Sequence, residues 1–162
     1  MRHAHTRIED TDQERLVEGA IENMIGSMKW AGITVDEGVN LDDQGNIIQT
    51  GDKGPYIQSQ RLDIYKKYAD ELLEKGHAYY CFCSKERLDE LRKFQELNKM
   101  PTGYDGHCRE GKLDEARERV KAGESSVIRM KMPKEGTTSY DDLIRGPVEF
   151  KNALVDDQVL LK

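Results

Sequence analysis

Three cysteines, all within residues 81–108, constrain this chain more than any other feature of its sequence. Cys81 and Cys83 are separated by a single residue, and Cys108 follows after a longer segment. Soft sulfur ligands that converge from two segments suit a tetrahedral zinc ion. The pair is tighter than the usual zinc pair, which has about two to four intervening residues. The spacing therefore predicts a zinc site with three sulfur ligands and leaves the fourth ligand open.

Three nearby side chains are candidates for the fourth ligand. Tyr104 precedes Cys108 by four residues, and glycines around it allow the backbone to wrap around an ion. His107 is intrinsically the better ligand, because a phenol with a pKa of about 10 must be ionised by the metal. However, adjacent residues on an extended segment point to opposite sides, so His107 and Cys108 would need a bend. Glu110 offers a harder oxygen donor, and the prediction places Tyr104 ahead of His107 and Glu110.

Two other interpretations of the cysteines involve no metal. Three reduced, partly buried thiols in a cytosolic protein would need no metal. A disulfide framework fits less well, because Cys81 and Cys83 are too close to meet disulfide geometry and any other pairing leaves one thiol free. Metal analysis separates the first alternative from the zinc site.

The composition limits the size and the compartment of the protein. A chain of 162 residues can hold one ordinary domain or pieces of two smaller ones. Only 36% of the residues are hydrophobic and 35% are charged, so the core depends on well-segregated faces. No apolar run is long enough to span a membrane, and no signal peptide opens the chain. These features predict that the protein is located in a bacterial-type cytoplasm.

The charge distribution bears on nucleic-acid binding. A net charge of -6 argues against binding through the overall field of the protein, although a local basic surface can still bind. Basic residues do gather after the third cysteine. They are Arg109, Lys112, Arg117, Arg119, Lys121, Arg129, Lys131 and Lys134. This segment is either an RNA-binding surface or a solvated face of mixed charge.

Hydrophobic periodicity predicts the helices and strands. Thr11 and Glu14 are spaced as a capping box for a helix that ends at Gly32. Its apolar positions are Leu16, Ile21, Met24, Ile25 and Met28. Further helices are expected at residues 59–76, 84–94 and 113–123, with a loop or small hairpin at 36–55. Strands are expected at 78–82 and 128–132, the second with Arg129 and Lys131 on its outer side, and short strands follow to the end.

Several segments, in order and at similar spacing, carry a resemblance to a known family. They are Arg7-Ile8-Glu9-Asp10-Thr11-Asp12-Gln13-Glu14-Arg15, Asp36-Glu37-Gly38, Gly54-Pro55-Tyr56-Ile57-Gln58-Ser59, Tyr104-Asp105-Gly106, Val127-Ile128-Arg129 and Asp156-Asp157-Gln158-Val159-Leu160-Leu161-Lys162. Together they resemble bacterial glutamyl-tRNA synthetase over nearly everything after the first six residues. Each piece alone is weak, but the series is highly specific.

The resemblance implies a class I aminoacyl-tRNA synthetase, a ligase that activates glutamate with ATP and Mg²⁺ and transfers it to tRNA(Glu). The implied fold class is α/β, a partial nucleotide-binding (Rossmann-like) fold with an inserted α+β domain. Residues 1–6 are then a leader, 7–75 the partial catalytic fold, 76–150 the inserted domain that embraces the tRNA acceptor end, and 151–162 a strand returning to the catalytic fold. In the family, the carboxylate at Glu9 faces the ammonium group of the substrate, which suits a charge-assisted hydrogen bond. From the residues alone, Glu9 would merely support a helix start.

The departures from the family pattern are as informative as the matches. The HIGH-like motif should precede Arg7 and the KMSKS-like motif should follow Lys162, and these 162 residues contain neither. We therefore expect an internal fragment without catalytic residues, and we expect this chain alone to be inactive. Some relatives bind zinc through Cys-x-Cys and Cys-x-His, and Glu110 stands where that histidine would be. The glutamyl-queuosine tRNA synthetases resemble a Cys-x-Cys and Tyr-x-x-x-Cys arrangement, which Tyr104 and Cys108 satisfy.

Other functions remain open at this point. One alternative is an enzyme like the glutamyl-queuosine tRNA synthetases. Another is a stand-alone, zinc-stabilised module that binds RNA in a salt-dependent way and needs no ATP site. A third is a structural or redox-labile domain with three free thiols.

Overall fold

The architecture comes from a computed structural model that describes residues 4–12 and 17–162. The chain divides into two compact units, Met1–Tyr65 and Lys66–Lys162. Each unit has its own sheet and its own cluster of buried apolar side chains. Helix α2 (Leu62–Glu74) contains the boundary between the two units.

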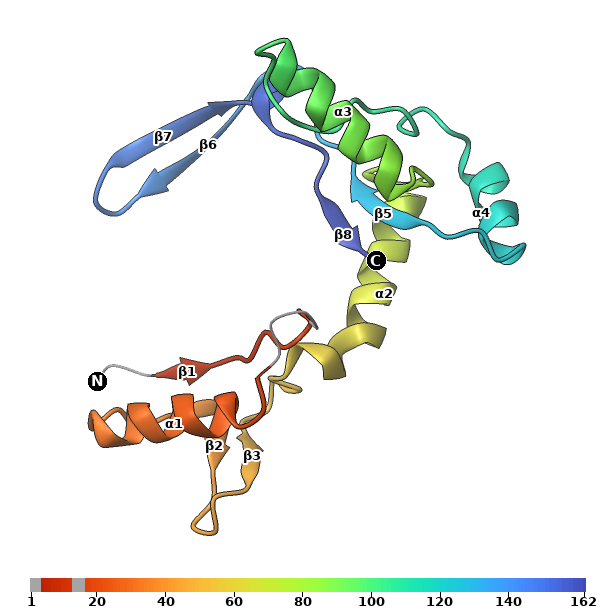
Figure 1. Cartoon of the computed structure of the whole chain (residues 1–162). Coiled ribbons are helices and arrows are strands. Elements are labelled where there is room, and N and C mark those ends of the chain that lie inside the picture. The colour runs from red at the N-terminus through yellow and green to blue at the C-terminus, as the bar shows by residue number, and fades with distance from the viewer. Residues whose placement is uncertain (1–3, 13–16) are drawn as a thin grey trace. The chain divides into compact units, whose positions relative to one another are not determined.

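The first unit is built on a three-stranded sheet with one helix beside it (Figure 1). Its elements are β1 (His5–Thr6), α1 (Ala20–Trp30), β2 (Glu37–Leu41), β3 (Ile47–Thr50) and the 3-10 helix η1 (Gln58–Arg61). Strand β2 lies in the centre, parallel to β1 and antiparallel to β3. The core consists of Ile8, Val39, Tyr56 and Ile57, with Ile21 of α1 packed against it.

The predicted first helix begins later than expected. Helix α1 starts at Ala20, directly after Gly19, whose φ of 75° lies in the left-handed region. That backbone conformation separates the helix from the residues before it. Of the predicted capping box, Glu14 lies outside the described residues, as does the apolar position Leu16. Thr11 is not helical and donates from its hydroxyl to Gln58 at 3.1 Å.

The segment 36–55 forms a hairpin, as predicted. Strands β2 and β3 pair from Gly38 to Leu41 on one side and from Ile47 to Thr50 on the other. Asp42 stabilises the turn, because its Oδ1 accepts the backbone N–H of Gln44 at 2.9 Å and of Asn46 at 2.8 Å. This local pattern is the asparagine and aspartate turn chemistry that the sequence contains.

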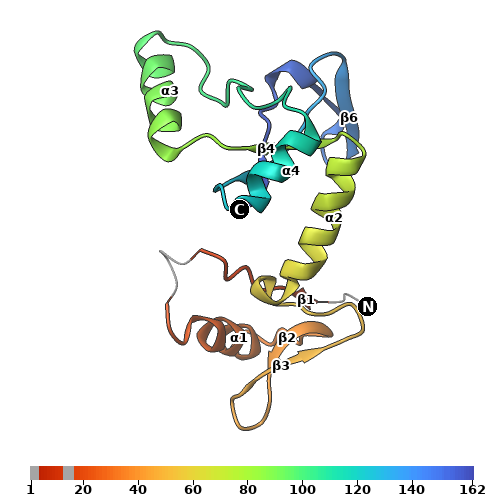
Figure 2. The ribbon, with the colours of Figure 1, turned by 90° about the vertical axis from the view of Figure 1, so that its right-hand side faces the viewer.

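The second unit holds most of the regular structure. Besides α2, its elements are β4 (Ala78–Cys81), α3 (Lys85–Leu97), α4 (Leu113–Lys121), β5 (Val127–Met130), β6 (Thr137–Asp142), β7 (Gly146–Lys151), the 3-10 helix η2 (Asn152–Leu154) and β8 (Val159–Leu161). Strands β4, β5 and β8 form an antiparallel sheet in that order, and β6 and β7 form a separate hairpin that extends away from it (Figures 1 and 2). No helix in residues 4–12 and 17–162 is both long and apolar enough to cross a membrane.

One face of the β4–β5–β8 sheet packs against helices α2 and α4. Period-two alternation directs Ala78 of β4 and Ile128 of β5 to this face. The full cluster comprises Ala69, Leu73, Ala78 and Ile128, with Leu72, Tyr80, Leu113 and Leu161 packed around it. The helices predicted at 59–76, 84–94 and 113–123 and the strand predicted at 78–82 are therefore confirmed. On α3, Leu88 and Leu91 are half-buried, but Phe94 is exposed and Gln95 is buried in its place, contrary to the expected apolar face.

The other face of the sheet is also covered, which corrects the prediction for Arg129. Alternation placed Arg129 on the outer side of a half-buried strand, but its side chain is only 7% exposed. Residues 103–109, here named the covering loop, and residues 156–158 lie over this face. In this cover, the ring of Tyr104 lies against the guanidinium of Arg129, and Arg109 forms an ion pair with Asp157. Strand β5 is therefore buried on both faces.

Strand β8 pairs with β5 inside the second unit. Its partners are Ile128 with Leu161 and Arg129 with Val159. The predicted functional domains, with boundaries at residues 75 and 150, stay a prediction, because compact units need not coincide with functional domains.

Candidate metal centre

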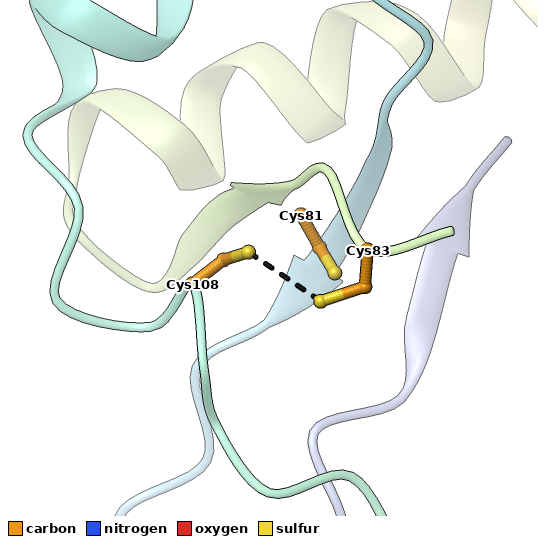
Figure 3. Close-up of side chains that lie close together, drawn as sticks. All are labelled: Cys81, Cys83 and Cys108. Carbon is orange, nitrogen blue, oxygen red and sulfur yellow. Dashed lines mark hydrogen bonds between the residues drawn. The ribbon is translucent and has the colours of Figure 1, made fainter. Parts of the chain in front are cut away.

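The three cysteines converge in the second unit, as the sequence predicts. Cys81 is the last residue of β4, Cys83 lies two residues beyond it, and Cys108 comes from the covering loop between α3 and α4 (Figure 3). Their sulfur atoms all lie within 4.8 Å of one another, and those of Cys83 and Cys108 are 3.7 Å apart. Cys81 is buried and the other two are half-buried. These residues are named the thiol cluster.

Local chain chemistry explains why Cys81 and Cys83 face the same point. On an extended segment, residues two apart point to the same side. Ser84 then ends the extended segment by capping α3, because its hydroxyl accepts the backbone N–H of Arg87 at 3.3 Å. The two sulfurs are therefore presented at the junction between a strand and a helix.

Tyr104 brings a fourth donor to the thiol cluster. Its hydroxyl oxygen lies 3.3 Å from the sulfur of Cys81 and 3.4 Å from that of Cys83. It also accepts the backbone N–H of Cys108 at 2.9 Å. The hydroxyl thus touches all three cysteine residues, and it does so through the wrapping of residues 104–108 that the spacing suggested.

The other two candidates do not join the thiol cluster. Among the described residues, the group of close donor atoms from His, Cys, Asp and Glu contains only the three cysteines. His107 is exposed. The carboxylate of Glu110 is 80% exposed and lies 3.4 Å from Lys131 and 3.6 Å from Arg109. Of the three, only Tyr104 is positioned to share an ion with the sulfurs.

The donor set fits a zinc ion. Three sulfurs and one phenol oxygen make four donors, of which the sulfurs are the soft type that zinc favours over magnesium or calcium. A tetrahedral zinc with Zn–S bonds of about 2.3 Å separates its sulfurs by about 3.8 Å. The 3.7 Å between Cys83 and Cys108 is close to that value.

Burial and hydrogen bonds set the protonation of the donors. Burial raises the pKa of the Cys83 thiol to about 11. Burial also raises the pKa of Tyr104, and its contacts with the three thiols raise it further. Burial alone would raise the pKa of Cys81, but interactions with the Tyr104 hydroxyl, the Cys83 backbone and the nearby guanidinium of Arg129 outweigh it and leave that pKa lowered. Only a bound cation would favour several ionised donors together at this site.

A buried carboxylate, Asp157, fastens the covering loop to the sheet. It is 1% exposed, and its Oδ2 accepts from the hydroxyl of Tyr79 at 2.7 Å and from Arg109 at 2.5 Å. Its Oδ1 accepts the backbone N–H of Met132 at 3.0 Å. Arg109 also donates to the carbonyl of Met132 at 2.6 Å. Because Arg109 directly follows Cys108, this network fixes the position of the third sulfur.

Two further contacts hold the start of the covering loop. The Gln95 amide makes two hydrogen bonds to the backbone of Gly103, at 2.9 and 3.1 Å. Asp156 accepts the backbone N–H of Tyr104 at 3.0 Å. Sequence reasoning missed Gln95, Asp157 and Arg129 as parts of the site. The available signals were a polar residue on the apolar side of a helix, an arginine within a buried strand and an aspartate two residues before β8.

Glu9 lies in the first unit and was predicted to bind the substrate. Its carboxylate is exposed and pairs with Arg7 at 2.8 Å. Both residues line a groove of about 560 Å³ together with Asp10 and residues of α1. Asp10 is held by Ser59, whose backbone N–H and hydroxyl donate to it at 2.9 and 2.6 Å. The role of Glu9 stays a prediction.

Comparison with known proteins decides the family. A model described as tRNA synthetases class I (E and Q), catalytic domain, matches residues 3–162. The chain belongs to this family. The predicted resemblance to glutamyl-tRNA synthetase is thereby confirmed, and so is the α/β class I synthetase fold, which the solved structure described below shares.

The similar proteins within this family are glutamate–tRNA ligases. That of Clostridioides difficile is 55% identical over 156 residues, which are 96% of this chain and 32% of that protein. That of Finegoldia magna is 51% identical over 158 residues, again 96% of this chain and 32% of the relative. A crystal structure of a glutamate tRNA ligase from Elizabethkingia meningosepticum in complex with its amino acid has a TM-score of 0.81 and 31% identity, and the match covers 98% of this chain and 31% of that one. The chain therefore spans about a third of the length of these synthetases.

The Asp157 network generates a prediction about stability and pH. Burial would raise the pKa of Asp157, but hydrogen bonds from Arg109, Tyr79 and the Met132 N–H leave it lowered. A lowered folded-state pKa contributes stability above the ordinary aspartate pKa of about 3.9, and this contribution is lost as the pH falls through the lowered value. We expect Asp157→Asn to reduce the free energy of unfolding by about 3 kcal/mol at pH 7, since it removes the buried negative charge that pairs with Arg109. Urea unfolding between pH 7 and pH 3 measures the difference.

The difference between the parent and Asp157→Asn should shrink below about pH 4. Asp141→Asn, on the exposed β6–β7 hairpin, is the matched control and should change stability by less than about 0.5 kcal/mol. A difference that stays constant or grows on acidification would contradict the role assigned to Asp157.

Proposed function

We propose that this chain is a segment of a cytoplasmic glutamate–tRNA ligase, which activates glutamate with ATP and Mg²⁺ and transfers it to the 3' end of tRNA(Glu). The observation that carries the proposal is the 55% identity to a glutamate–tRNA ligase over 96% of this chain. The family match over residues 3–162 supports the same conclusion. The alternative of a glutamyl-queuosine enzyme is not favoured, since both relatives described above are glutamate–tRNA ligases.

Within the longer enzyme, residues 7–75 would form part of the catalytic fold and 76–150 the inserted domain for the tRNA acceptor end. Residues 151–162 would return to the catalytic fold. Glu9 would bind the ammonium group of glutamate. Its position in a groove, next to Arg7, supports this assignment because the groove gives a small charged ligand access to the carboxylate. The groove also contains Asp10 and Asp12, which add negative charge where a cation would bind.

Zinc in the second unit would have a structural role. Cys81, Cys83, Cys108 and Tyr104 would hold Zn²⁺, which joins segments distant in sequence when it is bound. The residues of the chain already prepare this site. Ser84 caps the helix after the cysteine pair, and Asp157 and Arg109 fix the segment that carries Cys108. The zinc site would thereby stabilise the region between β4 and α4.

The zinc assignment predicts the metal content of the chain. Protein purified without chelator should contain about one equivalent of zinc. Tyr104→Phe removes the phenol oxygen and should weaken zinc binding at least about tenfold, because even outer contacts of a metal site contribute that much. His107→Ala and Glu110→Ala are the matched controls and should bind as the parent does, since neither side chain joins the thiol cluster. Less than about a tenth of an equivalent in the parent would contradict the site.

The role of Glu9 predicts a specific kinetic defect in the full-length enzyme. Glu9→Gln loses a hydrogen bond between charged groups, worth about 1.5–3 kcal/mol. We therefore expect kcat/KM for glutamate to fall about 10- to 100-fold in glutamate-dependent exchange of pyrophosphate into ATP, with the KM for ATP unchanged. Glu71→Gln, an exposed charge on α2, should have no effect.

A Glu9→Gln enzyme with the parental kcat/KM for glutamate would contradict the assignment of this residue. The 162-residue chain alone should show no exchange, because it contains neither signature motif that positions ATP. Robust exchange by this chain would contradict its assignment as a segment of the catalytic region.

A further inference from the structure

Arg129 is a buried cation directly beneath the thiol cluster. Its side chain is 7% exposed, although an arginine is rarely buried without a partner. On the sheet, Tyr79 pairs with Arg129 and Cys81 pairs with Val127. Arg129 is therefore the diagonal neighbour of Cys81 on the same face, at a distance that long side chains bridge.

One nitrogen of the Arg129 guanidinium donates a hydrogen bond, and another has no acceptor within residues 4–12 and 17–162. Its Nη1 donates to the backbone carbonyl of Asp157 at 2.9 Å. Its Nε is buried and has no hydrogen-bond partner among the residues that the structure describes. A buried N–H without a partner is costly, and this one is available to an acceptor that the site gains when a metal ionises its sulfurs.

The same guanidinium lies over the ring of Tyr104. The central carbon of Arg129 is 4.0 Å from the ring centroid, within the range of a cation–π contact. The ring carries the hydroxyl that lies 3.3 and 3.4 Å from the sulfurs of Cys81 and Cys83. A change in the χ1 angle of Tyr104 would swing this oxygen away from the sulfurs, so the contact with Arg129 fixes the direction of the fourth donor.

Charge provides an independent reason for a cation here. Three thiolates around a divalent ion carry one net negative charge, and an ionised phenol would add a second. Burial makes an uncompensated negative charge unfavourable. Arg87 contacts Cys83 at 3.6 Å but is already paired with Asp105 at 2.5 Å. The hydrogen bond of the Arg129 Nη1 goes to a neutral carbonyl, so no carboxylate in the described part of the chain neutralises this guanidinium and its charge acts on the site.

We propose that Arg129 is a positioning residue of the zinc site, which holds the ring of Tyr104 by stacking and donates its free Nε–H to the sulfur of Cys81 when that sulfur binds the metal. The inference rests on the proposed zinc site. It assigns to Arg129 the role of an outer contact that orients one ligand and balances the charge of another, as such contacts do in other metal sites.

Two substitutions in the 162-residue chain test this role. Arg129→Met removes the charge, the planar stack and the donor, and Arg129→Lys keeps the charge alone. Arg117→Met is the matched control, because Arg117 lies on α4, against the opposite face of the sheet, and pairs with Glu74. The measurements are the zinc dissociation constant by competition with a chromophoric chelator, the absorption spectrum of the Co²⁺-substituted protein, and urea unfolding of the metal-free protein.

We expect Arg129→Met to weaken zinc binding about 10- to 100-fold and Arg129→Lys to recover only part of this loss. The thiolate-to-cobalt absorption bands should change in both variants. Arg117→Met should keep the parental spectrum and bind zinc within about twofold of the parent. Unchanged zinc affinity and an unchanged cobalt spectrum in both Arg129 variants would overturn the inference, even if the metal-free protein were less stable.

The outcomes separate this inference from the zinc site itself. A parent chain that binds no zinc would remove the site and the inference together. A parent that binds one equivalent, with Arg129 variants that bind equally well, would leave the site in place and overturn only the role of Arg129. If Arg129→Met does not fold without metal, the affinity and the spectrum of Arg129→Lys decide.

Discussion

The buried carboxylate of Asp157 is the interaction on which the second unit depends. It is 1% exposed and joins Tyr79 of β4, Arg109 of the covering loop and the backbone at Met132. These segments are far apart in the sequence, and no apolar contact among them would fix their positions as closely as hydrogen bonds to an ionised group. Burial of this charge is tolerated because Arg109 and several donors surround it.

The consequence is a sheet with two different covered faces. One face packs aliphatic side chains against helices α2 and α4 and follows the usual alternation along β4 and β5. The other face holds Tyr79, Cys81 and Arg129 beneath the covering loop, together with Val127, and is here named the polar face. Cys108 and Tyr104 reach the cysteine pair because the loop is fastened to this polar face at both ends. The candidate metal centre is thus formed by the same polar contacts that hold the covering loop on this face of the sheet.

The parts of this structure that depend on local chemistry could be predicted from the sequence. The helix at 62–74 and the strand at 78–81 follow from periodicity and from the glycine after the helix, and the convergence of Cys81 and Cys83 follows from their spacing on an extended segment. The placement of Tyr104 was also expected, because it precedes Cys108 by four residues. The family followed from a series of short segments, and the comparisons confirmed it.

What could not be predicted depends on contacts between distant segments. Arg129 looked like the outer residue of a half-buried strand, because periodicity cannot reveal that a loop covers the second face. Gln95 replaced Phe94 as the buried residue of α3 for a similar reason, since its amide binds the backbone of Gly103. Helix α1 began later than its apolar pattern indicated because Gly19 adopts a left-handed conformation. Each error arose where a tertiary contact or a backbone angle outweighed the local pattern.

The central claim is that the polar face of the sheet assembles three sulfurs and one phenol oxygen around a single ion. Zinc K-edge X-ray absorption of the 162-residue chain, loaded with one equivalent of zinc, measures the donor atoms directly. The account predicts three sulfurs at about 2.3 Å and one oxygen at about 2.0 Å, with the oxygen altered in Tyr104→Phe and retained in His107→Ala. A shell with fewer than three sulfurs, or one that is the same in Tyr104→Phe as in the parent, would contradict it.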